Sequence, residues 1–192
     1  MSAPKILVMP GSLRTGSHNA RLAALAAKEL TLLDAEVTRI SLEDYELPLF
    51  DADVAGSALP AAAVKLKQAL TAHRGVFITS PEYSASVTPL LKNAIDWISR
   101  VRERGEPSYA AFKGRVFALG SATSGGGGGV RSLMALRQIL ELGCGALVIP
   151  EQVSVARAEL AFDDNDNLKD EALAAALRAA MRRLVELAGM MS

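Results

Sequence analysis

The chain has 192 residues, half of them apolar, and its 21 basic side chains balance 21 acidic ones, so the formal net charge is zero. This length suits one domain spanning residues 1–192, and the composition excludes intrinsic disorder. A neutral balance argues against nucleic acid or an anionic membrane as a partner.

Cysteine and histidine are scarce in this chain. The single cysteine, Cys144, excludes an intrachain disulfide, and the two histidines are too few for a histidine-based metal cage. The first apolar run, residues 5–9, is too short for the core of a signal peptide, and no run is long enough to span a bilayer. We therefore expect a protein of the reducing cytosol, with no metal site and no membrane segment.

Short β-type runs alternate with amphipathic helical patterns. Runs such as residues 6–8 and 76–78 are apolar without alternation, which is typical of strands covered by helices on both faces. The alternation predicts βαβ units, hence an α/β, flavodoxin-like three-layer sandwich whose five-stranded parallel sheet has the order 2-1-3-4-5. The expected strands are residues 5–9, 36–41, 75–80, 115–121 and 146–149, the expected helices are residues 19–33, 61–72, 89–101, 130–142 and 170–188, and no regular structure is expected in residues 42–59, 102–111 and 151–169.

The loop after the first expected strand is rich in hydrogen-bond donors. Ligands of a doubly wound sheet bind beyond the carboxyl ends of the strands, where this loop lies. Its donors, together with the free N–H groups at the start of the next helix, suit a phosphate; they are Ser12, Arg14, Thr15, Ser17 and Asn19. From the residues alone, a phosphate site and an ordinary polar turn remain equally open. His18 by itself is typical of an exposed loop residue.

Two further loops leave carboxyl ends of expected strands. The loop from Ser80 to Pro89 is bounded by prolines and can present N–H groups and the ring of Tyr83 to a flat ligand, although a packing role for Tyr83 fits equally well. The loop from Ser121 to Gly129 ends in five glycines, which suit either close approach of a ligand to the backbone or a flexible connector. No P-loop, dinucleotide-binding or nucleophile-elbow motif occurs.

Four motifs follow one another along the chain. They are Gly-Ser-Leu-Arg-x-x-Ser-x-Asn at 11–19, Pro-Glu-Tyr at 81–83 with Ser86, Leu-Lys-Asn-Ala-Ile-Asp-Trp at 91–97, and the glycine-rich loop after the fourth strand. In this order and spacing the chain resembles the NAD(P)H-dependent FMN reductase family of flavodoxin-like proteins, which includes enzymes that reduce quinones, azo dyes and chromate. The chain departs from the family pattern at Ser84, where Asn is usual, and at Ala85, where Gly or His is frequent.

The resemblance implies that FMN is bound and that NAD(P)H is a co-substrate. It implies that the phosphate is held by the first loop and that the isoalloxazine lies along the second loop and borders the third. The candidate cofactor-binding residues are Ser12, Arg14, Ser17, His18 and Asn19; Pro81, Glu82, Tyr83, Ser84 and Ser86; and Ser121, Thr123, Ser124, Gly125 and Gly126. No catalytic side chain is expected, because the flavin carries the chemistry.

The implied function is an oxidoreductase that passes hydride from NAD(P)H to FMN and then reduces a small acceptor by a ping-pong mechanism. The acceptor classes are a quinone, an azo compound, a metal oxyanion or free flavin. One alternative is a flavodoxin-type electron carrier without pyridine-nucleotide turnover, although such carriers are usually strongly acidic and this chain is neutral. A second is an interaction module with a degenerate site, suggested by Ser84.

Assembly is also expected from the resemblance, because family members are generally dimers or tetramers. We expect a homodimer or homotetramer, with residues 90–100 and the charged residues 102–104 as a candidate contact surface. Neither the physiological acceptor nor the choice between NADPH and NADH follows from the sequence.

Overall fold

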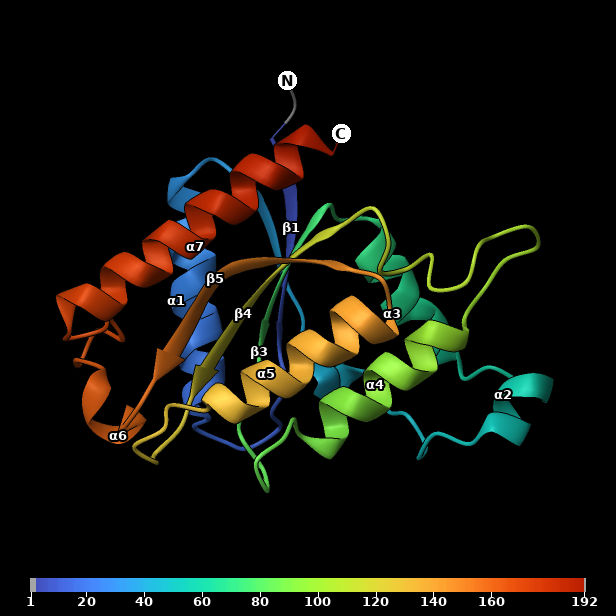
Figure 1. Ribbon diagram of the computed structural model, residues 1–192, viewed down its shortest axis with the longest axis horizontal. Coiled ribbons are helices and arrows are strands. Elements are labelled where there is room, and N and C mark those ends of the chain that lie inside the picture. The colour runs from blue at the N-terminus through green and yellow to red at the C-terminus, as the bar shows by residue number, and fades with distance from the viewer. Residues whose placement is uncertain (1–2, 192) are drawn as a thin grey trace.

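The computed structural model describes residues 3–191, which form a five-stranded parallel sheet between two layers of helices (Figure 1). The strands are β1 (Lys5–Pro10), β2 (Glu36–Arg39), β3 (Gly75–Thr79), β4 (Val116–Ala122) and β5 (Leu147–Val155). Their order is β2-β1-β3-β4-β5, and every neighbouring pair is parallel. The predicted fold class and strand order are confirmed.

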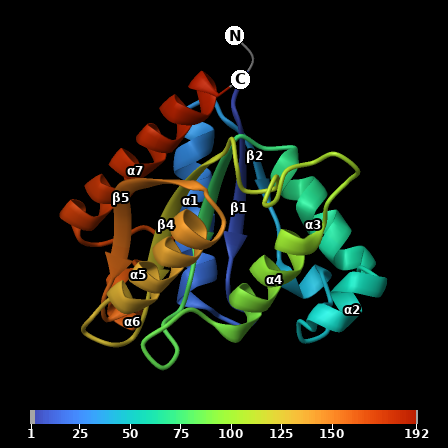
Figure 2. The ribbon, with the colours of Figure 1, turned by 45° about the vertical axis from the view of Figure 1, so that its right-hand side comes forward.

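Helices cover both faces of the sheet (Figures 1 and 2). One face carries α1 (His18–Leu32) and α7 (Glu171–Met190), and the other carries α3 (Ala61–Thr71), α4 (Pro89–Arg100) and α5 (Val130–Gln138). Four short segments complete the fold: η1 (Leu42–Asp44), α2 (Ala52–Ser57), η2 (Ile139–Gly143), which continues α5 as a π-helical turn, and α6 (Ala158–Ala161). Three of these, η1, α2 and α6, lie in stretches where no regular structure was expected.

Helices α1, α4 and α7 begin where a polar side chain can accept a backbone N–H. The hydroxyl of Ser17 accepts from Ala20 at the start of α1, and the hydroxyl of Thr88 accepts from Leu91 at the start of α4. Asp170 does the same for α7. Each such cap contributes about 1 kcal/mol, and Ser17 and Thr88 also fix where two loops at the carboxyl edge of the sheet end.

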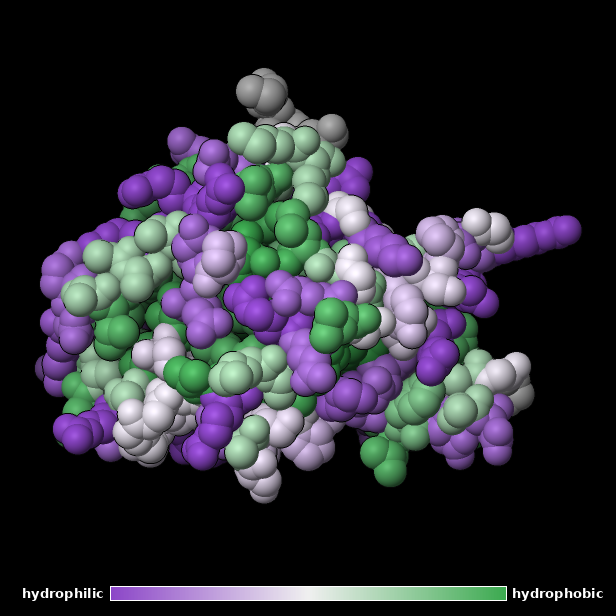
Figure 3. All heavy atoms as spheres, viewed as in Figure 1, coloured by the Kyte–Doolittle hydropathy of each residue, from purple (hydrophilic) through white to green (hydrophobic). Residues whose placement is uncertain are grey.

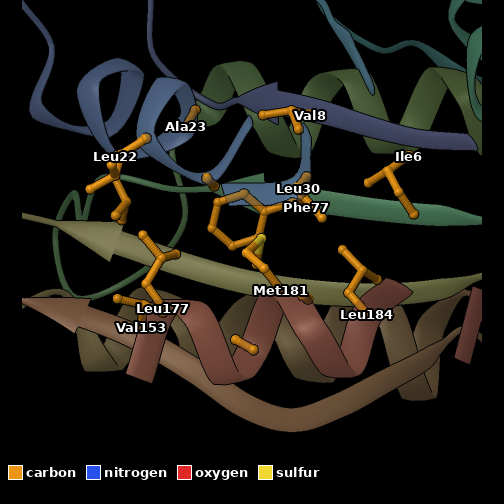
Figure 4. Packing of buried hydrophobic residues seen from close by; sticks show 14 of the residues in the cluster. Ile6, Val8, Leu22, Ala23, Leu30, Phe77, Val153, Leu177, Met181 and Leu184 are labelled. Atoms are coloured by element: carbon orange, nitrogen blue, oxygen red, sulfur yellow. The ribbon is translucent and has the colours of Figure 1, made fainter. Parts of the chain in front are cut away.

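The core lies in two layers, because successive strand residues point to opposite faces of the sheet. On the α1 and α7 side the ring of Phe77 lies among aliphatic side chains of both helices and of neighbouring strands, as Figure 4 shows for Ile6, Val8, Leu22, Leu30, Val153, Leu177, Met181 and Leu184. The opposite layer joins Leu7, Val76, Ile78 and Leu119 to α3, α4 and α5. Burying each large apolar side chain contributes about 1.5–3 kcal/mol.

A third, smaller cluster surrounds Trp97 on α4. Trp97 is fully buried, and its indole N–H donates to the carbonyl of Pro48 at 2.7 Å. The ring of Phe50 meets it edge-on, with 5.2 Å between ring centroids. Asn93 accepts from the N–H of Phe50 at 2.7 Å and donates to Pro48 at 2.9 Å. The motif at 91–97 therefore anchors the segment before α2.

The prediction that the last strand ends at residue 149 is wrong, since β5 continues to Val155. Pro150 lies where the register shifts, because Val148 pairs with Phe117 and Gln152 pairs with Leu119. An edge strand tolerates proline at such a bulge, where no ladder hydrogen bond is lost. The other bounds differ from the expected ones by a few residues.

The segment between α4 and β4 projects from the body as a hydrophilic arm (Figures 1 and 3). Its base is fixed by the ammonium group of Lys67, which is buried on α3 and forms ion pairs with Glu103 and Glu106. The pair with Glu106 lowers the pKa of that carboxyl group, chiefly through the hydrogen bond from Lys67.

The acidic stretch at residues 163–167 is a hydrogen-bonded turn. Asp163 accepts from the N–H groups of Asn165 and Asn167 at 2.9 and 2.8 Å. In residues 3–191, no cluster of three or more His, Cys, Asp or Glu side chains is arranged to hold a metal ion. Within the same range, no helix combines the length and the apolar character needed to cross a membrane.

Candidate functional site

Three loops gather at the carboxyl edge of the sheet, after β1, β3 and β4 (Figure 2). Between them lies a cleft of about 230 Å³, lined by Ser12, Arg14, Ser17, His18, Asn19, Pro81, Glu82, Tyr83, Ala122, Thr123 and Ser124. The structure thus brings together residues from all three predicted loops. Of the candidate residues, Ser84, Ser86, Ser121, Gly125 and Gly126 are not among the lining residues. Ala122 was missed, because an apolar strand end gives no chemical signal.

The first loop is held close to β3. The N–H of Gly11 donates to the carbonyl of Thr79 at 2.7 Å, and a Cβ at this position would lie 3.0 Å from that same oxygen. The hydroxyl of Thr88 donates to the carbonyl of Gly11 at 2.9 Å. Past this contact the loop turns outward, and the guanidinium of Arg14 is exposed, with a hydrogen bond to the carbonyl of Gly16 at 3.2 Å.

Asn19 connects the first loop to the third. Its side chain is buried, and its amide nitrogen donates to the carbonyl of Ala122 at 2.7 Å while its oxygen accepts from the N–H of the same residue at 3.1 Å. Both ends of the amide are therefore used within the protein. Asn19 positions the start of α1 against the end of β4. Because its side chain is used for this, only its backbone remains for the predicted contact with a phosphate.

His18 is the first residue of α1 and lines the cleft. Its Nδ1 atom is buried and has no hydrogen-bond partner within residues 3–191. Burial lowers the pKa of His18, the positive charges of Arg14 and Arg21 lower it further, and Glu159 opposes them. A buried polar atom without a partner is uncommon, and it indicates a ligand or water at this point of the cleft.

The second loop is a tight two-residue turn. Tyr83 and Ser86 exchange backbone hydrogen bonds of 3.0 and 2.9 Å, and the two residues between them, Ser84 and Ala85, both have positive φ, at 48° and 60°. This is the geometry of a type I′ turn, for which Asn-Gly is the preferred pair. The turn explains the family pattern at these positions in backbone terms, and it leaves the ring of Tyr83 half exposed at the cleft.

Glu82 fixes the second loop to the start of α5. Its carboxylate accepts from the side chain of Arg131 at 2.7 Å and from the backbone N–H of Arg131 at 3.1 Å. The hydrogen bond from the Arg131 side chain is the main reason why the pKa of Glu82 is lowered, and burial opposes it. The carboxylate is therefore ionised and engaged, and only the remaining surface of Glu82 is offered to a ligand.

Serine hydroxyls connect the base of the second loop to β4 and α5. Ser121 donates to the carbonyl of Ser80 at 2.7 Å, and Ser132 donates to the carbonyl of Pro81 at 2.9 Å. Both hydroxyl-bearing residues are fully buried. Ser121 thus supports the cleft from beneath, which was not apparent from its place in the motif.

The third loop combines open and crowded glycines. A Cβ atom added at Gly125, Gly126 or Gly127 would have no heavy atom within 4 Å. Gly129, in contrast, has φ of 82°, and a Cβ there would lie 1.8 Å from the hydroxyl oxygen of Ser121. The end of the glycine run is therefore required by packing, whereas its beginning is free to meet a ligand.

These features define a class of protein. A parallel sheet of order 2-1-3-4-5, with a donor-rich loop opening α1 and a cleft between the loops after β1, β3 and β4, defines a flavodoxin-like, nucleotide-binding α/β protein. The chain belongs to the NADPH-dependent FMN reductase family, whose family model matches residues 4–159.

Individual relatives agree with this assignment. Over 169 residues the chain is 34% identical to an NAD(P)H-dependent FMN reductase of Pseudomonas aeruginosa, covering 87% of this chain and 85% of that protein. It is 36% identical over 138 residues to a quinone reductase of Escherichia coli K12, covering 71% and 69% of the two chains. Among solved structures, the flavoenzyme FerB, an NAD(P)H:(acceptor) oxidoreductase from Paracoccus denitrificans, has a TM-score of 0.77 and 26% identity, over 98% of this chain and 99% of that one.

Family membership makes this protein an oxidoreductase with FMN as its cofactor and NAD(P)H as its co-substrate. The cleft suits this cofactor at its phosphate end. Arg14, Ser12 and the buried, unpartnered Nδ1 of His18 lie at the start of α1, where a helix favours an anion. The half-exposed ring of Tyr83 and the unobstructed backbone of residues 125–127 leave room for a flat ring beside the second and third loops.

Proposed function

We propose that this protein is a single FMN-binding domain, residues 1–192, which oxidises NAD(P)H and reduces a small acceptor in a ping-pong reaction. The observation that carries the proposal is the cleft itself, in which a cationic, donor-rich loop and an aromatic, backbone-rich surface face one ligand-sized space. When bound, FMN supplies the redox chemistry, by accepting a hydride and passing on two electrons. The protein binds FMN, orients it and shields it from solvent.

Residues at the phosphate end hold a dianion. Ser12 and Ser17 supply hydroxyls, Arg14 supplies a charged donor, and the helix start supplies backbone N–H groups. His18 has an unpartnered ring nitrogen that can meet a phosphate oxygen or a ribityl hydroxyl. Each charge-assisted hydrogen bond is worth about 1.5–3 kcal/mol, so a few of them hold the phosphate against water.

Residues at the ring end position the isoalloxazine without transferring a proton. This part of the cleft is bordered by Pro81, Glu82, Tyr83, Thr123 and Ser124. Gly125 and Gly126 follow Ser124 in the chain. Glu82 acts through its ion pair with Arg131, because its carboxylate is already engaged. Ser84 and Ser86 act through the turn that presents Tyr83, and Ser121 acts through the carbonyl of Ser80.

The acceptor takes the position that the coenzyme vacates, which is why turnover is ping-pong. A shared open face admits flat or small oxidants, so we propose quinones, azo compounds, metal oxyanions and free flavin as the acceptor classes. The quinone reductase name of the Escherichia coli relative favours a quinone among these. We also propose a cytosolic location, since the one cysteine, Cys144, is a free and buried thiol.

Mixing the purified flavin-loaded protein with NADPH or NADH tests the proposal. The visible flavin absorption should bleach after mixing with the coenzyme and should return when a quinone is added. A flavodoxin-type carrier would keep its oxidised spectrum, and that result would refute the enzyme function. Absence of bound flavin, with no thermal stabilisation by added FMN, would favour the interaction module.

A double variant tests where the phosphate of FMN binds. Arg14→Ala combined with Ser17→Ala should weaken FMN binding by tenfold or more, from the loss of about 1.5 kcal/mol per charge-assisted contact. The matched control is Arg182→Ala, an exposed arginine on α7 at a distance from the cleft. Retention of FMN by the double variant at wild-type affinity, measured by quenching of flavin fluorescence, would contradict this assignment.

We further propose a homodimer or homotetramer that uses α4 and the adjacent arm. The arm projects from the body and carries Arg102, Glu103 and Arg104 in an exposed run. Sedimentation equilibrium measures the state directly, and charge reversal at Arg104 should weaken the assembly. A monomer at all concentrations would refute the proposal.

A further inference from the structure

A second hollow lies on the other side of the first loop from Tyr83. It has a volume of about 460 Å³ and opens beside the carboxyl ends of β1 and β2. Ser12 and Arg14 line both this hollow, which we call the β2 cavity, and the cleft. A ligand that crosses the first loop can therefore occupy both spaces.

Two guanidinium groups line the β2 cavity. Arg39 is the last residue of β2, is exposed, and has no hydrogen bond or ion pair from its side chain within residues 3–191. Arg14 reaches the same cavity from the first loop, and its guanidinium donates to the carbonyl of Gly16. Arg14 is assigned to the FMN phosphate, so Arg39 is the guanidinium of this cavity that is left to donate to another anion.

The remaining polar residues of the β2 cavity suit a sugar and a base. Ser41 accepts from the N–H of Glu43 at 3.2 Å, which leaves its hydroxyl hydrogen for a ligand. Glu43 and Asp44 lie on η1 and are exposed at the other side of the cavity. Carboxylates accept hydrogen bonds from ribose hydroxyls and from an exocyclic amine. They also repel a phosphate, so the phosphate is favoured on the arginine side of the cavity.

We infer that the β2 cavity binds the adenosine half of NADPH and that Arg39 is the residue that recognises its 2′-phosphate. The inference rests on the proposed function, and it names the coenzyme that the cleft alone leaves open. In dinucleotide-binding sheets of the Rossmann type an arginine after the second strand accommodates this phosphate, and the planar guanidinium of Arg39 stands at the corresponding strand end. The nicotinamide end lies in the cleft, where the coenzyme meets the isoalloxazine.

Arg157 is the competing candidate. It precedes α6 on the opposite side of the cleft, is exposed, and contacts the glycine loop only through its backbone N–H, which donates to the carbonyl of Gly125 at 3.3 Å. A coenzyme that left the cleft in that direction would place its 2′-phosphate near Arg157. Arg39 is favoured because it lines a cavity together with Ser41, Glu43 and Asp44, which suit a ribose and a base, whereas Arg157 lines neither this cavity nor the cleft.

The experiment compares Arg39→Gln with Arg157→Gln and with Arg182→Gln as a distant control. Calorimetry measures binding of adenosine 2′,5′-bisphosphate and adenosine 5′-monophosphate to the flavin-loaded protein, and steady-state kinetics measure KM for NADPH and NADH. Arg39→Gln should weaken the bisphosphate and raise KM for NADPH by about tenfold, which corresponds to about 1.4 kcal/mol. The monophosphate, KM for NADH and the affinity for FMN should change by less than twofold.

Three results would overturn the inference. One is a wild-type protein that binds the two adenosine nucleotides equally. Another is an Arg39→Gln variant in which both coenzymes weaken together or neither does. The third is a selective loss in Arg157→Gln instead. Failure of the proposed function is distinguishable from all three, because the flavin would then not be bleached by either coenzyme.

Discussion

Gly129→Ala should destabilise the protein strongly, although it adds a single methyl group. Gly129 adopts φ of 82°, which costs a residue with a side chain about 1–2 kcal/mol. The new Cβ would lie 1.8 Å from the hydroxyl oxygen of Ser121, so that hydroxyl must move. Its movement breaks the 2.7 Å hydrogen bond to the buried carbonyl of Ser80, and an unsatisfied buried group costs about 1–3 kcal/mol. The expected loss is about 2–5 kcal/mol in the free energy of unfolding.

Gly127→Ala provides the matched control two residues earlier in the same loop. No heavy atom lies within 4 Å of a Cβ at Gly127, so this change should alter the free energy of unfolding by less than about 0.5 kcal/mol. Urea unfolding of both variants, with the transition midpoint and slope fitted separately, measures the difference. Equal midpoints for the two variants would refute the reasoning that packing against Ser121, and not general loop stiffness, requires Gly129.

Three other changes test the loops and the histidine. Ala85→Gly should stabilise the protein by up to about 1 kcal/mol in urea unfolding, because it relieves a positive φ of 60°; no gain, or a loss, would contradict the strained-turn assignment. Asn19→Ala should cost about 3 kcal/mol and weaken FMN binding, because the N–H and carbonyl of Ala122 both lose their partner; an unchanged FMN affinity would rule out coupling of the two loops. In the apoprotein the folded-state pKa of His18 lies below its unfolded value of 6.5, so the unfolded chain binds more protons and stability falls as the pH drops from 7.5 to 5.5. His18→Asn should flatten that fall, and an identical pH dependence in both proteins would oppose it.

Most of the fold could be predicted from the sequence because the strands are short apolar runs separated by helical periodicity. The failure at β5 has a specific cause, since Pro150 interrupts the pattern while an edge strand with a bulge accommodates it. The segments η1, α2 and α6 were missed because they are too short to show periodicity.

The candidate site was predictable at the level of loops and less so at the level of side chains. Motif positions indicated which loops meet, because strand order places their carboxyl ends together. They did not indicate that the amide of Asn19 bonds to Ala122 or that the carboxylate of Glu82 bonds to Arg131. In both pairs the partner lies far away in the chain. The β2 cavity was also missed, because Arg39 belongs to no motif.

Asn19 has a further consequence for affinity. Its side-chain amide bonds to both the N–H and the carbonyl of Ala122, so the first loop and the end of β4 are fixed relative to each other before any ligand binds. Binding therefore costs little conformational entropy for ordering these two walls, and we expect the affinity for a nucleotide to depend on this preorganisation more than on the number of contacts.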